Sequence, residues 1–295
     1  MNSSVNPFAK GLSFFLTLFP RSWIRFMGGL LGVLWFDILR FRRKIVLSNL
    51  SIAFPEKSPA WKVRTGRRSV VALGSNFAEL FTLPSLNQRW IAKNAVVEGE
   101  EHLRVAREKG KGALILTLHM GAADVAASLL PMHGHPAFLI SKFFKTKWFN
   151  DLWFSIRGAQ GMRFIEPHGE KAPFEILKGL KSNSLVIFVL DQYMGRPFGI
   201  PSTFFGKRTG TAYGLALFAL KTKAPVIPVY SFEGEDGRLH LRCLEPLNLT
   251  PFEGKERDEA MSEMTQLFNN VLEQIVRSHP EQWMWVHRRW KEFGP

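Results

Sequence analysis

His119 and Asp124 are the two residues with strong side-chain chemistry in the stretch ALILTLHMGAADVAASLL, Ala113 to Leu130, which is otherwise mostly apolar or small. A carboxylate beside an imidazole fixes the ring tautomer and stabilises the imidazolium, so that the histidine can act as a general base at neutral pH. The alternative is a core histidine that is bonded to an aspartate for structural reasons alone. On an ideal helix a spacing of five puts two side chains about 140° apart. The pair can therefore meet only if His119 lies in a loop and Asp124 lies in the first turns of the next helix.

The flanking sequence predicts that layout. Residues 112–118 form a continuous apolar run, typical of a strand buried on both faces, and a helix from about 121 to 130 follows. Ligands of open α/β sheets bind beyond the carboxyl ends of the strands, which is where His119 is expected. Asp191 and Gln192 follow a second buried strand at 184–190 and are expected to line the same edge. A turn that merely caps this strand is the alternative.

The whole chain alternates between strand and helix patterns. Strands are predicted at 94–99, 112–118, 137–141, 162–165, 184–190, 224–232 and 238–246, and helices at 59–84, 100–110, 121–130, 146–158, 174–182, 211–223 and 258–277. This order predicts an α/β fold with a mostly parallel sheet flanked by helices. No linker divides the catalytic domain that we expect over residues 46–295.

The first 45 residues have a different character. Apolar runs at 11–20 and 26–36 are separated by Arg21 and Arg25, and neither run reaches the ~20 residues that span a bilayer. The cluster RFRRK, Arg40 to Lys44, favours the cytoplasmic side of a membrane. Residues 1–45 are therefore predicted to be a membrane-anchoring helical segment. It would lie in the interface or span the bilayer at a tilt with the two arginines snorkelling; a buried helix pair is the alternative.

Composition narrows the class of partner. The 39 Lys and Arg against 25 Asp and Glu give a net charge of +14, which suits anionic partners such as nucleic acid, an anionic membrane, a phosphorylated substrate or an acidic protein. With 26 Phe and 9 Trp but 3 Tyr, the chain looks more like a membrane-surface protein than a nucleic-acid reader. The single cysteine, Cys243, excludes an internal disulfide and suits a reducing compartment. His133 and His135 lack an evident third ligand, so no metal site is predicted.

Several motifs, in order along the chain, carry a family resemblance. HMGAAD is an H-x4-D motif, and NLSIAFPEKS precedes it at Asn49–Ser58. It is followed by VLDQYMG (Val189–Gly195), STFFGKRTGTAYGLALFALKTKAPVIPVY (Ser202–Tyr230) and PEQWMWVHRRWK (Pro280–Lys291). Together they resemble the late acyltransferases of lipid A biosynthesis, the lauroyl and myristoyl transferases of Gram-negative inner membranes. The resemblance covers roughly Phe8 to Phe293 and implies a glycerolipid acyltransferase-like fold.

The resemblance also implies a reaction. An acyl carrier protein would donate a fatty acyl chain from its phosphopantetheine thioester, with no further cofactor, to a hydroxyl of a lipid A precursor, an anionic lipid. His119 would take the hydroxyl proton during the attack, and Asp124 would orient and charge-balance His119. No covalent acyl-enzyme is needed, which agrees with the absence of a G-x-S-x-G motif and with the position of Cys243 in a late strand. The enzyme would sit on the inner membrane with its catalytic domain facing the cytoplasm.

Two rival functions stay open. One is an acyltransferase of the same fold with another acceptor, such as a phospholipid, a glycolipid or an aminolipid. The other is a basic, non-catalytic lipid- or nucleic-acid-binding protein, for which the His119 and Asp124 pair at a strand end would be unnecessary.

Substrate-binding residues are predicted around this pair. Basic side chains that could bind phosphates or the acidic carrier are Arg157, Arg163, Lys142 and Arg208, although each could be an ordinary surface charge. Thr209 and Gly210 are predicted to open a helix whose N-terminal amides could hold an anion or an oxyanion, with plain N-capping as the alternative.

Two positions depart from the pattern that the resemblance leads us to expect. Residue 142 is Lys rather than Arg, and residue 192 is Gln rather than a second ionisable group. They leave the acyl chain length and the acceptor open. His287, among Trp283, Trp285 and Trp290, is predicted to belong to a packed or membrane-surface tail rather than to be a second catalytic histidine.

Overall fold

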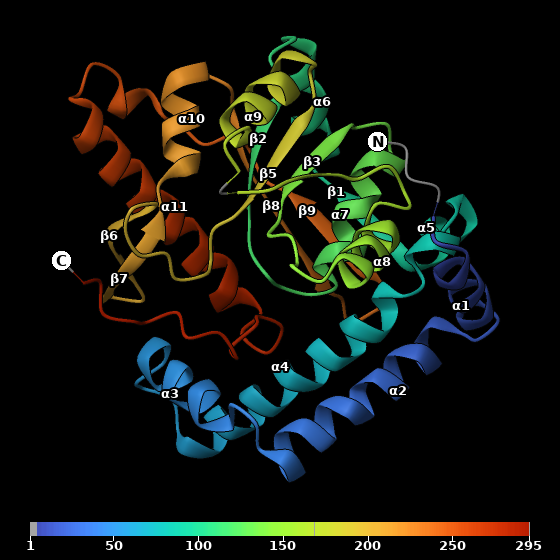
Figure 1. Cartoon of the computed structure of the whole chain (residues 1–295). Coiled ribbons are helices and arrows are strands. Elements are labelled where there is room, and N and C mark those ends of the chain that lie inside the picture. The colour runs from blue at the N-terminus through green and yellow to red at the C-terminus, as the bar shows by residue number, and fades with distance from the viewer. Residues whose placement is uncertain (1–4, 168, 295) are drawn as a thin grey trace.

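A seven-stranded sheet forms the centre of the computed structural model, which describes residues 5–167 and 169–294 (Figure 1). Its strands are β1 (Ala95–Glu98), β2 (Ala113–Thr117), β3 (Ala137–Ile140), β4 (Arg163–Ile165), β5 (Leu185–Val189), β8 (Val226–Glu233) and β9 (Leu239–Cys243). They lie in the order β1-β9-β8-β2-β5-β3-β4. Every neighbouring pair is parallel except β8 with β9, which confirms the predicted mostly parallel α/β sheet.

The two central strands position the residues that follow them. β2 and β5 are continuous apolar runs that can be buried on both faces, and they pair in parallel with Thr117 opposite Val189. His119 lies two residues beyond Thr117, and Asp191 lies two residues beyond Val189. The register of this strand pair therefore brings His119 and Asp191 to the same point of the carboxyl edge.

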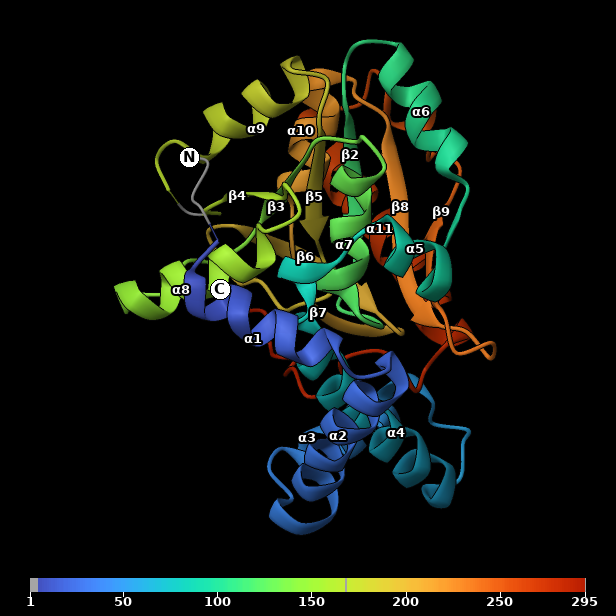
Figure 2. The ribbon, with the colours of Figure 1, turned by 90° about the vertical axis from the view of Figure 1, so that its right-hand side faces the viewer.

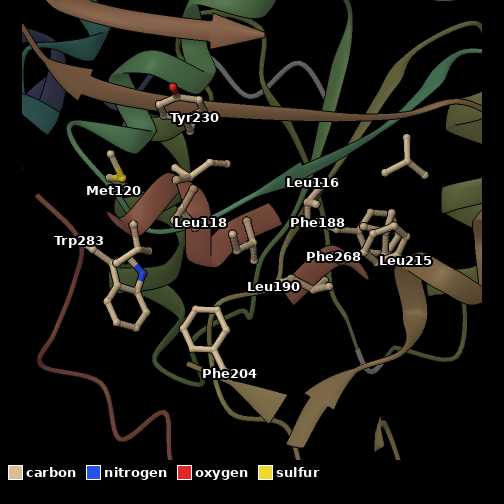
Figure 3. Packing of buried hydrophobic residues seen from close by; sticks show 14 of the residues in the cluster. Leu116, Leu118, Met120, Phe188, Leu190, Phe204, Leu215, Tyr230, Phe268 and Trp283 are labelled. Carbon is tan, nitrogen blue, oxygen red and sulfur yellow. The ribbon is translucent and has the colours of Figure 1, made fainter. Parts of the chain in front are cut away.

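Helices cover both faces of the sheet. One face carries α9 (Ala172–Lys181), α10 (Gly214–Thr222) and α11 (Arg257–Ser278), whose core includes Leu116 and Phe188 (Figure 3). The opposite face carries α5 (Gln88–Asn94), α6 (Glu100–Glu108), α7 (Ala123–Met132) and α8 (Lys147–Arg157), whose core includes Ile115 and Ile187. Alternate residues of one strand thus serve two separate cores, as the two-residue period of a strand requires.

An antiparallel hairpin lies outside the main sheet and was not predicted. β6 (Gly199–Phe204) and β7 (Lys207–Ala212) are joined by Phe205 and Gly206, which both have positive φ (51° and 68°). Two such residues are what a type I′ hairpin turn needs. The predicted helix start at Thr209 and Gly210 is therefore wrong, since both residues belong to β7 and α10 begins at Gly214.

Most of the N-terminal helices form a layer below the sheet, whereas the first of them lies beside α8 (Figure 2). They are α1 (Pro7–Thr17), α2 (Arg21–Val33), the π-helix η1 (Leu34–Leu39), α3 (Arg43–Ala53) and α4 (Pro59–Leu80); the short 3-10 helices η2 (Leu83–Ser85) and η3 (Thr250–Phe252) complete the fold. The predicted boundary between residues 45 and 46 falls inside α3. Residues 1–4 of the predicted anchor, and residues 168 and 295 of the predicted catalytic domain, lie outside the described part of the chain.

Glycines allow α2 and α4 to cross at very short range. A Cβ at Gly28 would lie 2.5 Å from the carbonyl oxygen of Gly74, and one at Gly32 would lie 2.5 Å from the Cα of Val71. A small residue at every fourth position allows such backbone contact and is frequent where helices pack in membranes. Residues beside this contact face outward, among them Phe26 (61 % exposed) and Leu31 (58 %). By length and composition alone, Arg21–Leu39 could cross a membrane.

Arg21 and Arg25 are the exception to the apolar character of α2. Both guanidinium groups contact the buried carboxylate of Glu79 on α4, and both also reach Glu233 at the end of β8. The side chain of Arg21 is only 7 % exposed and that of Glu79 only 1 %. The expectation that these arginines snorkel toward a membrane surface is therefore wrong, because they tie α2 to α4 and to the sheet.

We expect Glu79→Ala to lower the free energy of unfolding by about 3–5 kcal/mol, because it leaves two largely buried guanidinium groups without their shared partner. Glu108→Ala is the matched control: its pair with Arg104 is exposed, so the loss should stay below about 1 kcal/mol. Denaturant unfolding of both proteins in the same detergent measures the difference. Equal stability of the two variants would contradict the structural importance of the network.

Candidate functional site

His119 and Asp191 form a hydrogen-bonded pair at the carboxyl edge of the sheet. Nδ1 of His119 lies 2.8 Å from Oδ1 of Asp191, so Nδ1–H donates to the carboxylate. The other carboxylate oxygen, Oδ2, accepts from the backbone N–H of His119 at 3.0 Å and from the indole Nε1–H of Trp283 at 2.7 Å. These three hydrogen bonds fix the carboxylate and the tautomer, and they leave Nε2 of His119 without a protein partner among the described residues.

The electrostatics of the pair favour its charged form. Burial alone would lower the pKa of His119, but the charge and hydrogen bond of Asp191 outweigh it and raise that pKa above the ordinary value of 6.5. Burial would raise the pKa of Asp191, yet the hydrogen bonds from His119 and Trp283 and the His119 charge hold it below its usual range. Asp191 is therefore ionised at neutral pH and can stabilise an imidazolium on His119.

The loop that carries His119 is held at several backbone positions. The carbonyl of His119 accepts from the backbone N–H of Met284, and the carbonyl of Met120 accepts from the hydroxyl of Ser231 at 2.8 Å. Gly121 has a φ of +58°, and a Cβ there would lie 2.6 Å from the carbonyl oxygen of Ser231, so a larger residue would move the loop. The imidazole is thus presented by a backbone with little freedom.

Asp124 does not make the contact with His119 that its spacing suggested. It lies in the first turn of α7, as expected, but its Oδ1 pairs with the guanidinium group of Arg157 at 2.6 Å. Arg157 also donates to Ser141 and lies over the rings of Phe164 and Trp153. The hydrogen-bonding partner of His119 is Asp191, and Asp124 contributes to the site through its charge and through Arg157.

A cavity of about 1490 Å³ opens beside His119. Its volume exceeds the roughly 300–1,000 Å³ of a typical small-molecule site. The wall includes His119, Asp124, Arg157 and Gln192, while most of the remaining lining is apolar. The cavity therefore combines one reactive imidazole with room for a large apolar ligand.

The cavity reaches both faces of the sheet. Phe188 belongs to the core under α9 and α10, whereas Ile187 belongs to the core under α7, and both line the cavity. Leu217 of α10 and Ala127 of α7 line it on these two sides. Because a paired sheet is closed between its strands, the two parts meet around its carboxyl edge, where His119 lies. Two apolar chains could then extend away from one reactive centre.

The other predicted binding residues separate into two groups. Lys142 and Gln192 line the cavity, and Nε2 of Gln192 lies 3.5 Å from Nδ1 of His119. Arg163 and Arg208 are exposed and are not part of the cavity lining; Arg163 lies over the ring of Phe138 instead. The amides of Thr209 and Gly210 belong to strand β7 and form no helix N-terminus.

Thr209 and Gly210 support the loop after Asp191. Their strand is held by the fully buried Arg289, which donates to the carbonyl oxygen of Gly210, while the carbonyl of Gly210 also accepts from the backbone N–H of Met194. Burial lowers the pKa of Arg289 to about 10, so it stays charged at neutral pH. Thr209 and Gly210 therefore help to hold the backbone of the site, and they form no helix N-terminus that would bind an anion.

The C-terminal segment supplies residues that sequence reasoning missed. Trp283 donates to Asp191, and Nε2 of His287 accepts the backbone N–H of Tyr193 at 3.2 Å. Burial lowers the pKa of His287 to about 4, so this ring is neutral and acts as an acceptor. Trp283 and Trp285 are buried, so the prediction of a packed tail is confirmed for them. The signal available in the sequence was the run of tryptophan and arginine residues in this segment, because such side chains need hydrogen-bonding partners when they are buried.

Other chemistry is remote from this site. Cys243 is buried, and burial raises the pKa of its thiol to about 12, so it is no nucleophile at neutral pH. Within residues 5–167 and 169–294 no group of three or more His, Cys, Asp or Glu side chains is arranged to hold a metal ion. His133 and His135 both bond to Glu100.

A large cavity with an aspartate-bound histidine at its edge is suited to proton transfer on an apolar substrate, and comparison with known proteins assigns the class. Residues 8–292 match the family described as bacterial lipid A biosynthesis acyltransferase, and the chain belongs to this family. It is therefore an acyltransferase that acts on a lipid acceptor.

Individual relatives agree at the level of the class. The chain is 25 % identical to the lipid A biosynthesis lauroyltransferase of Escherichia coli (strain K12), over 93 % of each chain. It is 22 % identical to the lipid A biosynthesis palmitoleoyltransferase of the same organism, over 96 % of this chain and 90 % of that one. It is 26 % identical to a phosphatidylinositol mannoside acyltransferase of Mycobacterium tuberculosis (strain CDC 1551 / Oshkosh), over 75 % of this chain and 69 % of that one.

Proposed function

We propose that this protein transfers a fatty acyl chain from the thioester of an acyl carrier protein to a hydroxyl group of a lipid A precursor. The observation that carries the proposal is the His119 ring at the edge of a cavity of about 1490 Å³: Nδ1 is bound by Asp191, and Nε2 has no partner among the described residues. A general base next to apolar space is what the acylation of a lipid hydroxyl requires.

The reaction follows from that geometry. Nε2 of His119 takes the proton of the acceptor hydroxyl while its oxygen attacks the thioester carbonyl carbon. The charge of Asp191 stabilises the imidazolium that forms. The tetrahedral intermediate then collapses, the C–S bond breaks, and the imidazolium returns its proton to the leaving thiolate. The new ester and the free thiol account for all atoms, and His119 ends as it began.

The electrostatics of the cavity mouth support an acidic donor protein. Lys142 and Lys145 are both exposed and both line the cavity, and neither has an ion-pair partner in the part of the chain that the structure describes. An exposed pair of lysines on a chain with a net charge of +14 would attract an acidic carrier and orient it toward the cavity. The thioester arm would then enter beside His119.

The exposed apolar side chains of the N-terminal helices support the proposed association with a membrane. Exposed apolar side chains continue from α1 through η1, including Phe14, Leu31 and Ile38. An apolar surface this extended on a soluble face would be unfavourable, and it suits insertion into the bilayer interface. The proposed location is the inner membrane, with the catalytic domain on the cytoplasmic side where acyl carrier protein is found.

A glycolipid acceptor of the mannoside type is the second candidate. The mycobacterial relative, named for phosphatidylinositol mannoside, is 26 % identical over 75 % of this chain, against 25 % over 93 % for the Escherichia coli lauroyltransferase. An acyl-transfer assay on detergent-solubilised protein tests the two acceptors directly. Transfer to a tetra-acylated lipid A precursor supports the proposal; transfer to a phosphatidylinositol mannoside alone replaces the acceptor, and transfer to no lipid hydroxyl contradicts the reaction.

Filling the cavity should change which acyl chains are used. Ala127→Phe and Leu217→Trp each fill one side of the cavity, and we expect one of the two to shift the preference toward shorter donors, because the added ring occupies space that the donor chain needs. Competition between acyl carrier protein thioesters of different lengths measures this shift. The other substitution of the pair should instead raise the KM for the acceptor. An unchanged preference and unchanged KM in both variants would contradict the role of this cavity.

A further inference from the structure

A second cavity, of about 690 Å³, lies at the junction of η1 and α3 and shares no lining residue with the cavity beside His119. Five of its lining residues are cationic: Arg40, Arg42, Arg43, Lys44 and Arg288. The remaining lining residues, Phe41, Ile45 and Leu47, are apolar. Among residues 5–167 and 169–294, no acidic side chain lines this hollow, which we call the cationic pocket.

The charges of the cationic pocket are not neutralised by the protein. Among the described residues, none of its five cations forms an ion pair. Asp37, which lies in the preceding turn, is paired with Arg67 instead. Arg40 and Arg42 spend one N–H each on the backbone carbonyls of Asp37 and Val286. Five cations left together around one hollow repel each other, so the arrangement favours a bound anion.

The surroundings identify the chemistry of that anion. The side chains beside the pocket are strongly exposed apolar residues: Ile38 (69 %), Leu39 (66 %) and Phe41 (60 %). A free nucleotide or an acidic peptide would leave this apolar surface in water. A lipid satisfies both parts, because its phosphate can lie among the cations while its acyl chains cover the apolar residues.

We propose that the cationic pocket binds the phosphate headgroup of an anionic membrane lipid, as a site separate from the reactive cavity. Arg288 is exposed and follows His287, which bonds to Tyr193 beside the reactive edge. Arg42 donates to the carbonyl of Val286, and Asn49 of α3 donates to the carbonyls of Trp285 and His287. The segment that supplies Trp283 to Asp191 is thus anchored at the cationic pocket. A bound headgroup would hold the enzyme on the membrane with this segment in place.

The test is vesicle flotation with the full-length chain. Wild type is compared with the double variant Lys44→Glu/Arg288→Glu, because both residues are exposed and neither bonds to another described group. The control Lys109→Glu/Lys111→Glu makes the same change of charge at exposed positions before β2, at the opposite edge of the sheet. Vesicles are phosphatidylcholine alone or phosphatidylcholine with phosphatidylglycerol. The neutral variant Lys44→Gln/Arg288→Gln and circular dichroism guard against misfolding.

We expect the pocket variant to lose the preference for phosphatidylglycerol by about tenfold or more while binding phosphatidylcholine as wild type does. The control should keep the preference. Equal losses in pocket variant and control would mean diffuse attraction without a site, and would overturn the proposal. The proposal would also be overturned if the pocket variant bound both kinds of vesicle as wild type does but was no longer stabilised by inorganic phosphate. It would likewise be overturned if the only change were weaker saturation of the enzyme by acyl carrier protein. Vesicle binding needs no turnover, so the result is independent of the proposed reaction.

Discussion

His119→Ala is expected to reduce the turnover number for acyl transfer by about 10²–10⁴-fold, the range that a positioned general base contributes. The reason is geometric: at the edge of the large cavity Nδ1 of this ring is held by Asp191, while Nε2 has no partner in the part of the chain that the structure describes. The measurement is the turnover number of the detergent-solubilised enzyme at saturating acyl carrier protein thioester. Binding of the donor should change little, because the alanine removes a proton acceptor and leaves the cavity wall.

His133→Ala provides the matched control. His133 bonds to Glu100 and is not part of the lining of the large cavity, so its loss should leave turnover near the wild-type value. Circular dichroism spectra of both variants exclude a difference in folding. If His119→Ala were as active as His133→Ala, the proton acceptor would be another group, and the proposed mechanism would be wrong.

Asp191→Asn is expected to lower the turnover number by up to about 10⁴-fold, as replacing the orienting aspartate of a catalytic triad by asparagine does. The amide has the shape of the carboxylate but lacks its charge, and its NH₂ group cannot accept from His119 or Trp283. The ring then loses its fixed tautomer, and its imidazolium loses the partner that stabilises it. The variant should still fold, because the volume of the side chain is unchanged.

The pH profile distinguishes this role from a structural one. A general base works when unprotonated, so activity rises with pH through the pKa of His119, which Asp191 holds above 6.5. Without that charge the pKa falls, and the acid limb of kcat/KM should move to lower pH in Asp191→Asn. In Asp124→Asn the bond between His119 and Asp191 remains, so the limb should move less. A larger shift in Asp124→Asn would return the orienting role to Asp124.

Much of the sheet follows from the sequence because its strands are unambiguous. The runs of β2 and β5 are apolar except for Thr117 at the end of β2, so their sequences predicted strands buried on both faces. The hairpin β6–β7 was missed because its turn uses Phe205 and Gly206 instead of the usual Asn-Gly or Asp-Gly pair. Its strands carry Lys, Arg, Thr and Gly, whose pattern gives no strong alternation.

The site was predicted in part, and the part that failed has a physical cause. The short spacing along the chain favoured Asp124 as the partner of His119, because two residues that are five positions apart can lie close together in space. Parallel pairing instead brings residues 119 and 191 together across 72 positions, and this contact depends on the register of β2 with β5. The contact could be inferred once both strands and their register were known, because His119 and Asp191 each lie two positions beyond the paired residues Thr117 and Val189. Trp283 could not be placed this way, because it lies on an irregular segment.

The ion pairs that hold α2 bear on how freely this helix, which belongs to the proposed membrane anchor, can be exchanged. If α2 were only an anchor, chimeras that carry an unrelated hydrophobic helix in its place would keep their activity. Here any substitute would have to present guanidinium groups to Glu79 and Glu233, and small residues to Val71 and Gly74. Asn76 extends this constraint, since it accepts from Arg25 and donates to the carbonyl of Gly121 in the loop after His119. Helix α2 and the sheet domain would therefore change together in evolution. A truncated form that lacks α2 would need compensating substitutions inside the sheet domain to be soluble in water.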